Sequence, residues 1–320
     1  MTSGQKTGPQ ARRWLARGVL AAAVAVLAAC ATRTQGPTES LAIPQAGGTE
    51  VIMSNPQKTV VLDLATLDTL HALGVDAVAG LPQAPLPAFL AGYADELRYP
   101  RVGPLFEPDA AAIRALAPDL IIVGGRSAGK REELKSIAPT LDLSVPPGDL
   151  VAAVSDNVRL LADIYEREEA ARPLLQHLHA TAQAVRERMQ GQGRGLVVLT
   201  TGGKIMALPP GPRFGAIYET LGITPLPLEV EPGARGKPVD AAFLREQDPD
   251  WLFVIDRDAA VGRDETPARQ LLDQPSLRDS RAWREGHVVY LDPVDWYILG
   301  AGGITSLQRG LDQVAAALDP

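Results

Sequence analysis

The sequence has almost no cysteine, few histidines and few aromatic residues. Its 320 residues include one Cys, four His and 5% aromatic side chains. A single cysteine excludes an intramolecular disulfide framework, and scattered histidines without an H-E-x-x-H pattern leave a structural zinc site without its ligands. Positive charge is scarce too, because 31 Lys and Arg stand against 38 Asp and Glu. A broad basic surface for nucleic acid is therefore disfavoured, and any bound anion must meet a local basic cluster.

Long apolar runs are also missing, and the one near the N-terminus, residues 19–29, is too short to span a bilayer. Four basic residues precede it, which predicts a secretory signal peptide over 1–29. The run ends in Leu27-Ala28-Ala29-Cys30, which resembles a lipobox, so we expect lipidation at Cys30. The alternative is a conventional cleavage site beside a buried free cysteine. Removing the signal peptide leaves 27 basic and 38 acidic residues.

Residues 30–50 are rich in Thr, Gly, Pro and Gln, which predicts a flexible tether between the lipid and the first folded residues. The protein is therefore expected outside the cytoplasm, held at a membrane surface. With 46% hydrophobic residues, the rest of the chain is long enough for two cores.

From about residue 58 onward, short apolar runs alternate with amphipathic segments, which is typical of β-α units around parallel sheets. One unit recurs after 131 residues, as a helix followed by Pro-Asp and a buried strand. Its matching residues are Asp109 and Asp240, Pro118 and Pro249, and Arg126 and Arg257. The repeat indicates two similar lobes.

Between the lobes, apolar residues from Leu174 to Met189 recur at helical spacing. We therefore predict an N-terminal lobe over 51–165, one long linking helix over 166–192, and a C-terminal lobe over 193–320. A single helical connector favours small lobe motions over wide closure.

Three arginines are the candidate anion-binding residues. Arg126 and Arg257 each follow a strand, where open α/β sheets bind their ligands, and Arg213 lies in a loop just before a helix. The alternative is that each arginine pairs with a nearby acid such as Asp256 or Asp258. The repeat favours a shared anion site for the three.

Trp296 and Tyr297 stand beside glycines in a loop that leads into the last helix. Both suit ligand contact, and the Tyr297 phenolate could also bind ferric iron as a hard oxygen donor. The alternative is that these aromatic side chains pack the lobe interface.

Gly125-Arg126-Ser127-Ala128-Gly129 matches the G-x-S-x-G motif of serine hydrolases. No oxyanion loop precedes Ser127, and the available histidines are poorly placed in the sequence: His177 and His179 on the linking helix, and His287 at the start of a strand. A serine hydrolase is therefore kept as the alternative from another functional class.

Together these features resemble the iron-siderophore substrate-binding lipoproteins of ABC importers, closest to the ferric-catecholate, enterobactin-type binders. The most specific stretches are residues 212–215, 236–237, 248–257 and 290–297. The resemblance implies an α/β fold with two Rossmann-like lobes joined by a single long α-helix (a class III periplasmic binding protein), no intrinsic cofactor and no enzymatic activity. It also implies a ferric siderophore held between the lobes by Arg126, Arg213 and Arg257.

Two departures from the family pattern concern the ligand. In relatives that capture tetradentate siderophores, a His and a Tyr complete the iron coordination; the Tyr matches Tyr297, but Arg235 stands where the His is expected. Our hypothesis is a coordinatively complete, highly charged iron complex, with Arg235 as a fourth cationic contact and Tyr297 as a hydrogen-bond donor. A cobalamin or haem carrier of the same fold is the other alternative.

A further departure concerns the permease. Relatives present one Glu on each lobe to permease arginines, and this chain has Ala111 and Ala242 at those positions. Asp109 and Asp240 could take over this role, or the ligand could pass to another partner. The resemblance implies a monomer.

Overall fold

The computed structural model describes residues 1–2, 39–211, 213–231 and 233–319, and the compact unit spans Ser40–Pro320. The predicted signal peptide, Cys30 and the first part of the predicted tether lie outside the described residues. Within the described residues, no helix combines the length and hydropathy needed to cross a bilayer.

The N-terminal lobe is built on a five-stranded, fully parallel sheet of order β5-β4-β3-β6-β7. Helices, 3-10 turns and a small hairpin surround it. Its elements are β1 (Ser40–Gln45), β2 (Gly48–Met53), β3 (Thr59–Val61), α2 (Leu64–Ala72), β4 (Val78–Gln83), η1 (Ala88–Ala94), β5 (Arg101–Pro104), α3 (Ala110–Ala115), β6 (Leu120–Val123), η2 (Ala128–Lys130), α4 (Arg131–Leu134), β7 (Thr140–Asp142) and α5 (Leu150–Tyr165).

The C-terminal lobe has a six-stranded mixed sheet, in which β12 pairs in parallel with β8 and β13, while β9 pairs antiparallel with both of its neighbours, β8 and β11. Its elements are β8 (Arg194–Thr201), β9 (Lys204–Leu208), η3 (Arg213–Gly215), α7 (Ala216–Leu221), β10 (Thr224–Pro225), β11 (Lys237–Val239), α8 (Ala241–Gln247), β12 (Trp251–Asp256), α9 (Arg257–Ala260), α10 (Ala268–Leu272), α11 (Pro275–Arg278), α12 (Arg281–Arg284), β13 (Val288–Tyr290), η4 (Val294–Ile298) and α13 (Ile304–Ala317). The predicted α/β class with two lobes is confirmed.

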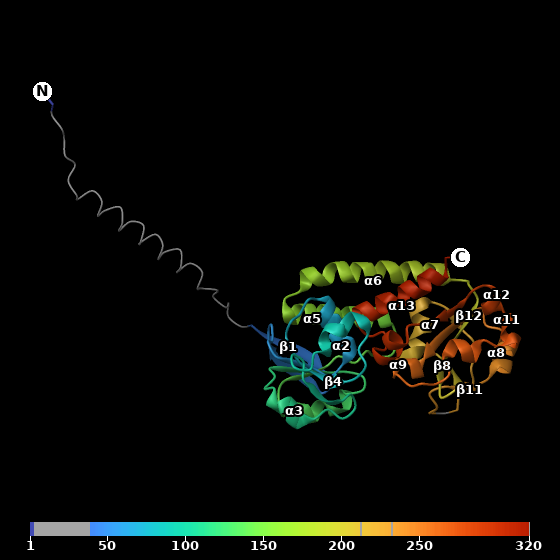
Figure 1. Cartoon of the computed structure of the whole chain (residues 1–320), viewed down its shortest axis with the longest axis horizontal. Helices are drawn as coiled ribbons and strands as arrows, with labels where there is room; N and C mark the ends of the chain where they lie inside the picture. Colours follow the sequence, from blue (N-terminus) through green and yellow to red (C-terminus); the bar gives the residue numbers. More distant parts are fainter. Residues whose placement is uncertain (3–38, 212, 232, 320) are drawn as a thin grey trace. The chain divides into compact units, whose positions relative to one another are not determined.

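A single long helix, α6 (Glu168–Met189), joins the lobes. Its buried stripe, which includes Leu178, Ala182 and Val185, packs against α5 of the first lobe, α7 of the second, and α13. Figure 1 shows α6 and α13 side by side. Since α13 also packs on α2 and α5, the last helix of the chain is fixed to the first lobe.

The repeated helix-Pro-Asp-strand unit forms the same local structure in both lobes. Asp109 caps α3 by accepting two backbone N–H groups of its first turn, and Asp240 caps α8 by accepting one. The Asp119 carboxylate accepts the N–H groups of Gln57 and Lys58 at 2.9 Å, just before β3. Asp250 accepts the N–H of Arg194 at 2.7 Å, where β8 begins. In each lobe the second aspartate therefore ties the start of a neighbouring strand to the repeated unit.

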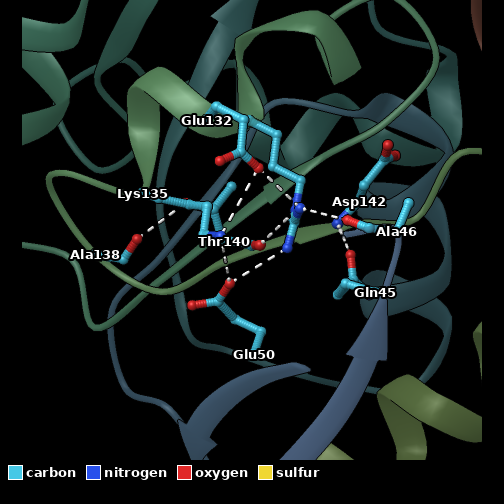
Figure 2. A network of polar contacts seen from close by, with 9 residues as sticks. Gln45, Ala46, Glu50, Glu132, Lys135, Ala138, Thr140 and Asp142 are labelled. Atoms are coloured by element: carbon cyan, nitrogen blue, oxygen red, sulfur yellow. Dashed lines mark hydrogen bonds and ion pairs between the residues drawn. The ribbon is translucent and has the colours of Figure 1, made fainter. Parts of the chain in front are cut away.

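The predicted tether over 30–50 is wrong at its C-terminal end, because residues 40–53 form the β1–β2 hairpin. Its Ile43 and Ile52 are buried in the main core. Polar contacts hold the hairpin: the guanidinium of Arg131 donates to Ala46 O (3.1 Å) and to Glu50 Oε2 (3.3 Å). Figure 2 shows Ala46 and Glu50 in this network. Gln45 also accepts the N–H of Asp142 at 2.8 Å. Within the predicted tether, the polar composition concealed one buried residue, Ile43.

Candidate functional site

The site forms where strand-end loops of the two lobes meet. Arg126 follows β6 in the first lobe, and Arg257 directly follows β12 in the second. Two hydrogen bonds fix the loop of Arg126: the N–H of Gly124 donates to Ser127 Oγ, and the N–H of Gly125 donates to Ser144 Oγ at 2.8 Å. The third arginine, Arg213, opens the short η3 turn before α7 with a positive φ of 65°.

All three arginines converge on Tyr297, which lies in the π-helical turn η4 rather than in the predicted open loop. Arg126 donates to Tyr297 O at 2.6 Å and to Ile298 O at 2.7 Å. Arg213 donates to the same Tyr297 carbonyl at 2.8 Å, and Arg257 Nε donates to the Tyr297 hydroxyl at 2.8 Å. We call Arg126, Arg213, Arg257 and Tyr297 the arginine cluster.

The aromatic ring of Tyr297 lies among these cations. The guanidinium carbons of Arg126, Arg213 and Arg257 lie 5.7, 4.9 and 5.5 Å from its centroid, within cation–π range. Phe214 stacks on Tyr297, with ring centroids 5.9 Å apart and planes inclined by 17°. The cluster thus offers both cationic and aromatic contacts to a ligand.

The positive charge of the cluster is poorly compensated. Among the described residues, no carboxylate lies within 4.0 Å of the Arg126 or Arg213 guanidinium, and Arg257 has only Asp258 at 3.4 Å. Loss of hydration lowers the pKa of Arg126, and for Arg213 the same cause and the repulsion of Arg126 and Arg235 lower the pKa to about 10. Guanidiniums stay protonated at neutral pH even so, and an anion would relieve their repulsion.

Of the two remaining candidates, Arg235 acts on the charge of Arg213, and Trp296 is buried away from the arginine cluster. Arg235 is exposed and close enough to Arg213 to act on its charge. Trp296 is 2% exposed and packs against Gly310 of α13, where an added Cβ would lie 2.8 Å from the indole. The prediction that Trp296 contacts the ligand is therefore wrong, because its indole is buried against α13.

Ser127 is not placed as a nucleophile. Its side chain is fully buried, and its hydroxyl donates to Leu62 O at 3.0 Å while accepting the N–H of Gly124 at 3.1 Å. His179 instead shares a 2.8 Å hydrogen bond with Ser155 on α5. The serine of the G-x-S-x-G motif therefore stabilises the Arg126 loop, and the hydrolase alternative is wrong.

Asp295 lies in the same π-helical turn and is completely buried. Its Oδ2 accepts Arg309 Nε at 2.6 Å, while Oδ1 has no hydrogen-bond partner among the described residues. Burial raises its pKa to about 6, against the opposing effect of Arg309. The folded protein thus binds this proton more tightly than the unfolded chain does.

We therefore expect this carboxyl to lower stability as the pH rises from about 4 to about 6, by at most ~3 kcal/mol. Relative to the wild type, Asp295→Asn should lose this decline. Urea unfolding of both proteins at intervals from pH 4 to pH 7 measures the difference. Asp273→Asn, at an exposed carboxylate paired with Arg278, is the matched control. Parallel pH profiles for wild type and Asp295→Asn would contradict the expectation.

Comparison with known protein families identifies the family of this chain. The family described as "Periplasmic binding protein" matches residues 59–294. The chain belongs to that family. It is 34% identical to the petrobactin-binding protein YclQ of Bacillus subtilis over 274 residues, which cover 85% of each chain. The resemblance stated from the sequence motifs is confirmed at the level of the family: the relatives are substrate-binding proteins of transport systems, not enzymes.

Solved structures agree with this assignment. The siderophore-binding protein BauB, bound to ferric iron and two acinetobactin molecules, superposes with a TM-score of 0.78 at 30% identity, over 88% of this chain and 99% of BauB. The catecholate-siderophore binding protein VctP of Vibrio cholerae gives 0.78 at 27% identity, over 87% of this chain and all of VctP. The fold is that of a class III periplasmic binding protein.

Proposed function

We propose that this protein binds an anionic ferric siderophore of the catecholate type and delivers it to an ABC importer for iron uptake. The observation that carries the proposal is the arginine cluster, in which guanidiniums from both lobes converge and, among the described residues, only Arg257 has a carboxylate partner, Asp258. A ferric catecholate is an anion with aromatic faces, so it suits both ion pairing and guanidinium stacking. The names of YclQ, BauB and VctP support an iron-chelate ligand.

We further propose that the preferred ligand is a coordinatively complete iron complex. The Tyr297 hydroxyl accepts a hydrogen bond from Arg257, which leaves its own proton free to donate to a ligand oxygen. Arg235, near Arg213, adds a fourth cation where iron-ligating relatives have a histidine. The Arg235 guanidinium cannot ligate iron, but its positive charge adds affinity for a highly charged anionic complex.

The membrane and permease roles that we propose are based on the sequence. A lipid on Cys30 would hold the protein outside the cytoplasm, at the membrane that carries the importer. Asp109 and Asp240 are exposed, and each uses only Oδ1 to cap its helix. Their second oxygens remain for permease arginines in place of the glutamates expected at Ala111 and Ala242.

Titration of the purified protein with iron(III) tris-catecholate, iron(III) bis-catecholate, ferric hydroxamate, haem and cobalamin tests the proposal. Tryptophan fluorescence is a suitable readout because Trp296 immediately precedes Tyr297 in η4. We expect strongest quenching with the tris-catecholate complex. Tighter binding of haem or cobalamin would favour the carrier alternative instead, and a charge-transfer band lost in Tyr297→Phe would show direct iron ligation by the phenolate.

A further inference from the structure

Phe106 is unusual among the large apolar side chains because it is 63% exposed, while most of the others are buried. It lies near the tip of a tight turn in which the N–H of Glu107 donates to Pro104 O at 3.2 Å. Exposing a phenylalanine forgoes the stabilisation that burying its ring would give. A position of this kind suggests a contact made with something other than the protein's own core.

The Phe106 turn lies at the same edge of the first-lobe sheet as Arg126. It follows β5, and the sheet is fully parallel, so the turn lies at the same edge as the Arg126 loop after β6. A salt bridge joins the two loops directly: Glu107 Oε2 lies 2.6 Å from Lys130 Nζ. The N–H of Lys130 in turn donates to Ser127 O at 2.9 Å, beside Arg126.

The turn is held in one conformation by its backbone. Gly103 has a φ of 91°, and a Cβ there would lie 2.8 Å from the backbone nitrogen of Asp109. The N–H of Asp109 donates to Val102 O at 2.8 Å and closes the loop. Phe106 is therefore presented on a fixed support rather than on a loose segment.

We propose that Phe106 is a specificity residue that packs against the aromatic rings of the ligand from the N-terminal lobe. The inference rests on the proposed function and deepens it. On the opposite lobe, Phe214 and Tyr297 already present stacked aromatic faces. A catechol ring held by the arginine cluster would meet Phe106 from the other side. An aliphatic carboxylate chelator would satisfy the arginines but gain nothing from Phe106.

The experiment compares two ligands and two variants. Phe106→Ala should weaken binding of iron(III) tris-catecholate by about tenfold, as expected for loss of an aromatic contact. Binding of iron(III) citrate should change less than about twofold, since the cations remain. Phe106→Tyr, which keeps the ring, should retain wild-type preference. Leu97→Ala is the matched control: Leu97 is 98% exposed, but it precedes β5 at the opposite end of the strand.

The outcomes separate this inference from the proposed function. A wild-type protein that binds neither iron complex would overturn both. Wild-type catecholate binding that Phe106→Ala leaves unchanged would overturn the role of Phe106 alone. Equal losses for catecholate and citrate would also overturn it, because they would indicate a general distortion of the site. A circular dichroism melt of each variant excludes unfolding as the cause of a loss.

Discussion

Replacing Arg126, Arg213 and Arg257 together by alanine is expected to weaken binding of a ferric catecholate by at least about a thousandfold. Each charge-assisted hydrogen bond to an anion contributes about 1.5–3 kcal/mol, and about 4 kcal/mol in total corresponds to that factor. The three guanidiniums come from different loops and meet at Tyr297, so the triple variant removes every cation of the arginine cluster. Isothermal titration calorimetry at fixed salt concentration measures the loss.

The same variant should keep its stability within about 1 kcal/mol, because relief of cation repulsion offsets the lost hydrogen bonds to the Tyr297 and Ile298 carbonyls. This combination distinguishes a ligand site from a structural cluster. Arg159, Arg172 and Arg278, each exposed and paired with an acid on the surface, give a matched triple-alanine control. Retained binding in the cluster variant, or its unfolding, would contradict the assignment.

The free cluster also shows what ligand binding must displace. Arg126 and Arg213 donate to the same backbone carbonyl, so the η4 turn occupies guanidinium groups that an anion would use. Arg126 belongs to the first lobe and Tyr297 to the second, so these hydrogen bonds also join the lobes. Lysine at either arginine position would keep the charge but lose the forked donor geometry, and we expect an intermediate loss of affinity.

Much of the fold was predictable because the two lobes repeat one local solution. The 131-residue spacing gave the placement of Arg126 and Arg257 after equivalent strands, and the helical apolar stripe gave α6. Each strand-Arg unit and the α6 stripe is a local pattern of buried and exposed residues, and such patterns appear directly in the periodicity of the sequence.

What could not be predicted depends on packing between distant segments. The burial of Trp296 requires Gly310 on the next helix, and the hairpin over 40–53 requires the Arg131 and Asp142 partners of the first lobe. The antiparallel strand β9 did have a local signal. Gly202 and Gly203, with φ of 55° and 69°, form the two-residue turn between β8 and β9, as Gly-Gly between apolar runs predicts.

Gly303 is expected to tolerate no side chain, and Gly303→Ala should destabilise the protein by about 3 kcal/mol. Its φ of −98° is open to any residue, so space rather than conformation is the constraint. An added Cβ would collide with the Asp68 carboxylate. That carboxylate is buried, and it accepts the N–H groups of Thr305 at 3.1 Å and Ser306 at 2.8 Å.

The expected cost is large because Asp68 cannot retreat without leaving its charge buried and unpartnered. These hydrogen bonds attach the start of α13 to α2, and α13 also contacts η4, so Gly303→Ala should additionally weaken ligand binding. Chemical denaturation measures the first effect. Gly92→Ala is the control, since an added Cβ there meets open space. This substitution should leave the free energy of unfolding unchanged or raise it slightly. Equal stability of the two variants would contradict this account, and the attachment of Tyr297 to the first lobe would then have to come from α6 and from the Arg126 hydrogen bonds to the Tyr297 and Ile298 carbonyls.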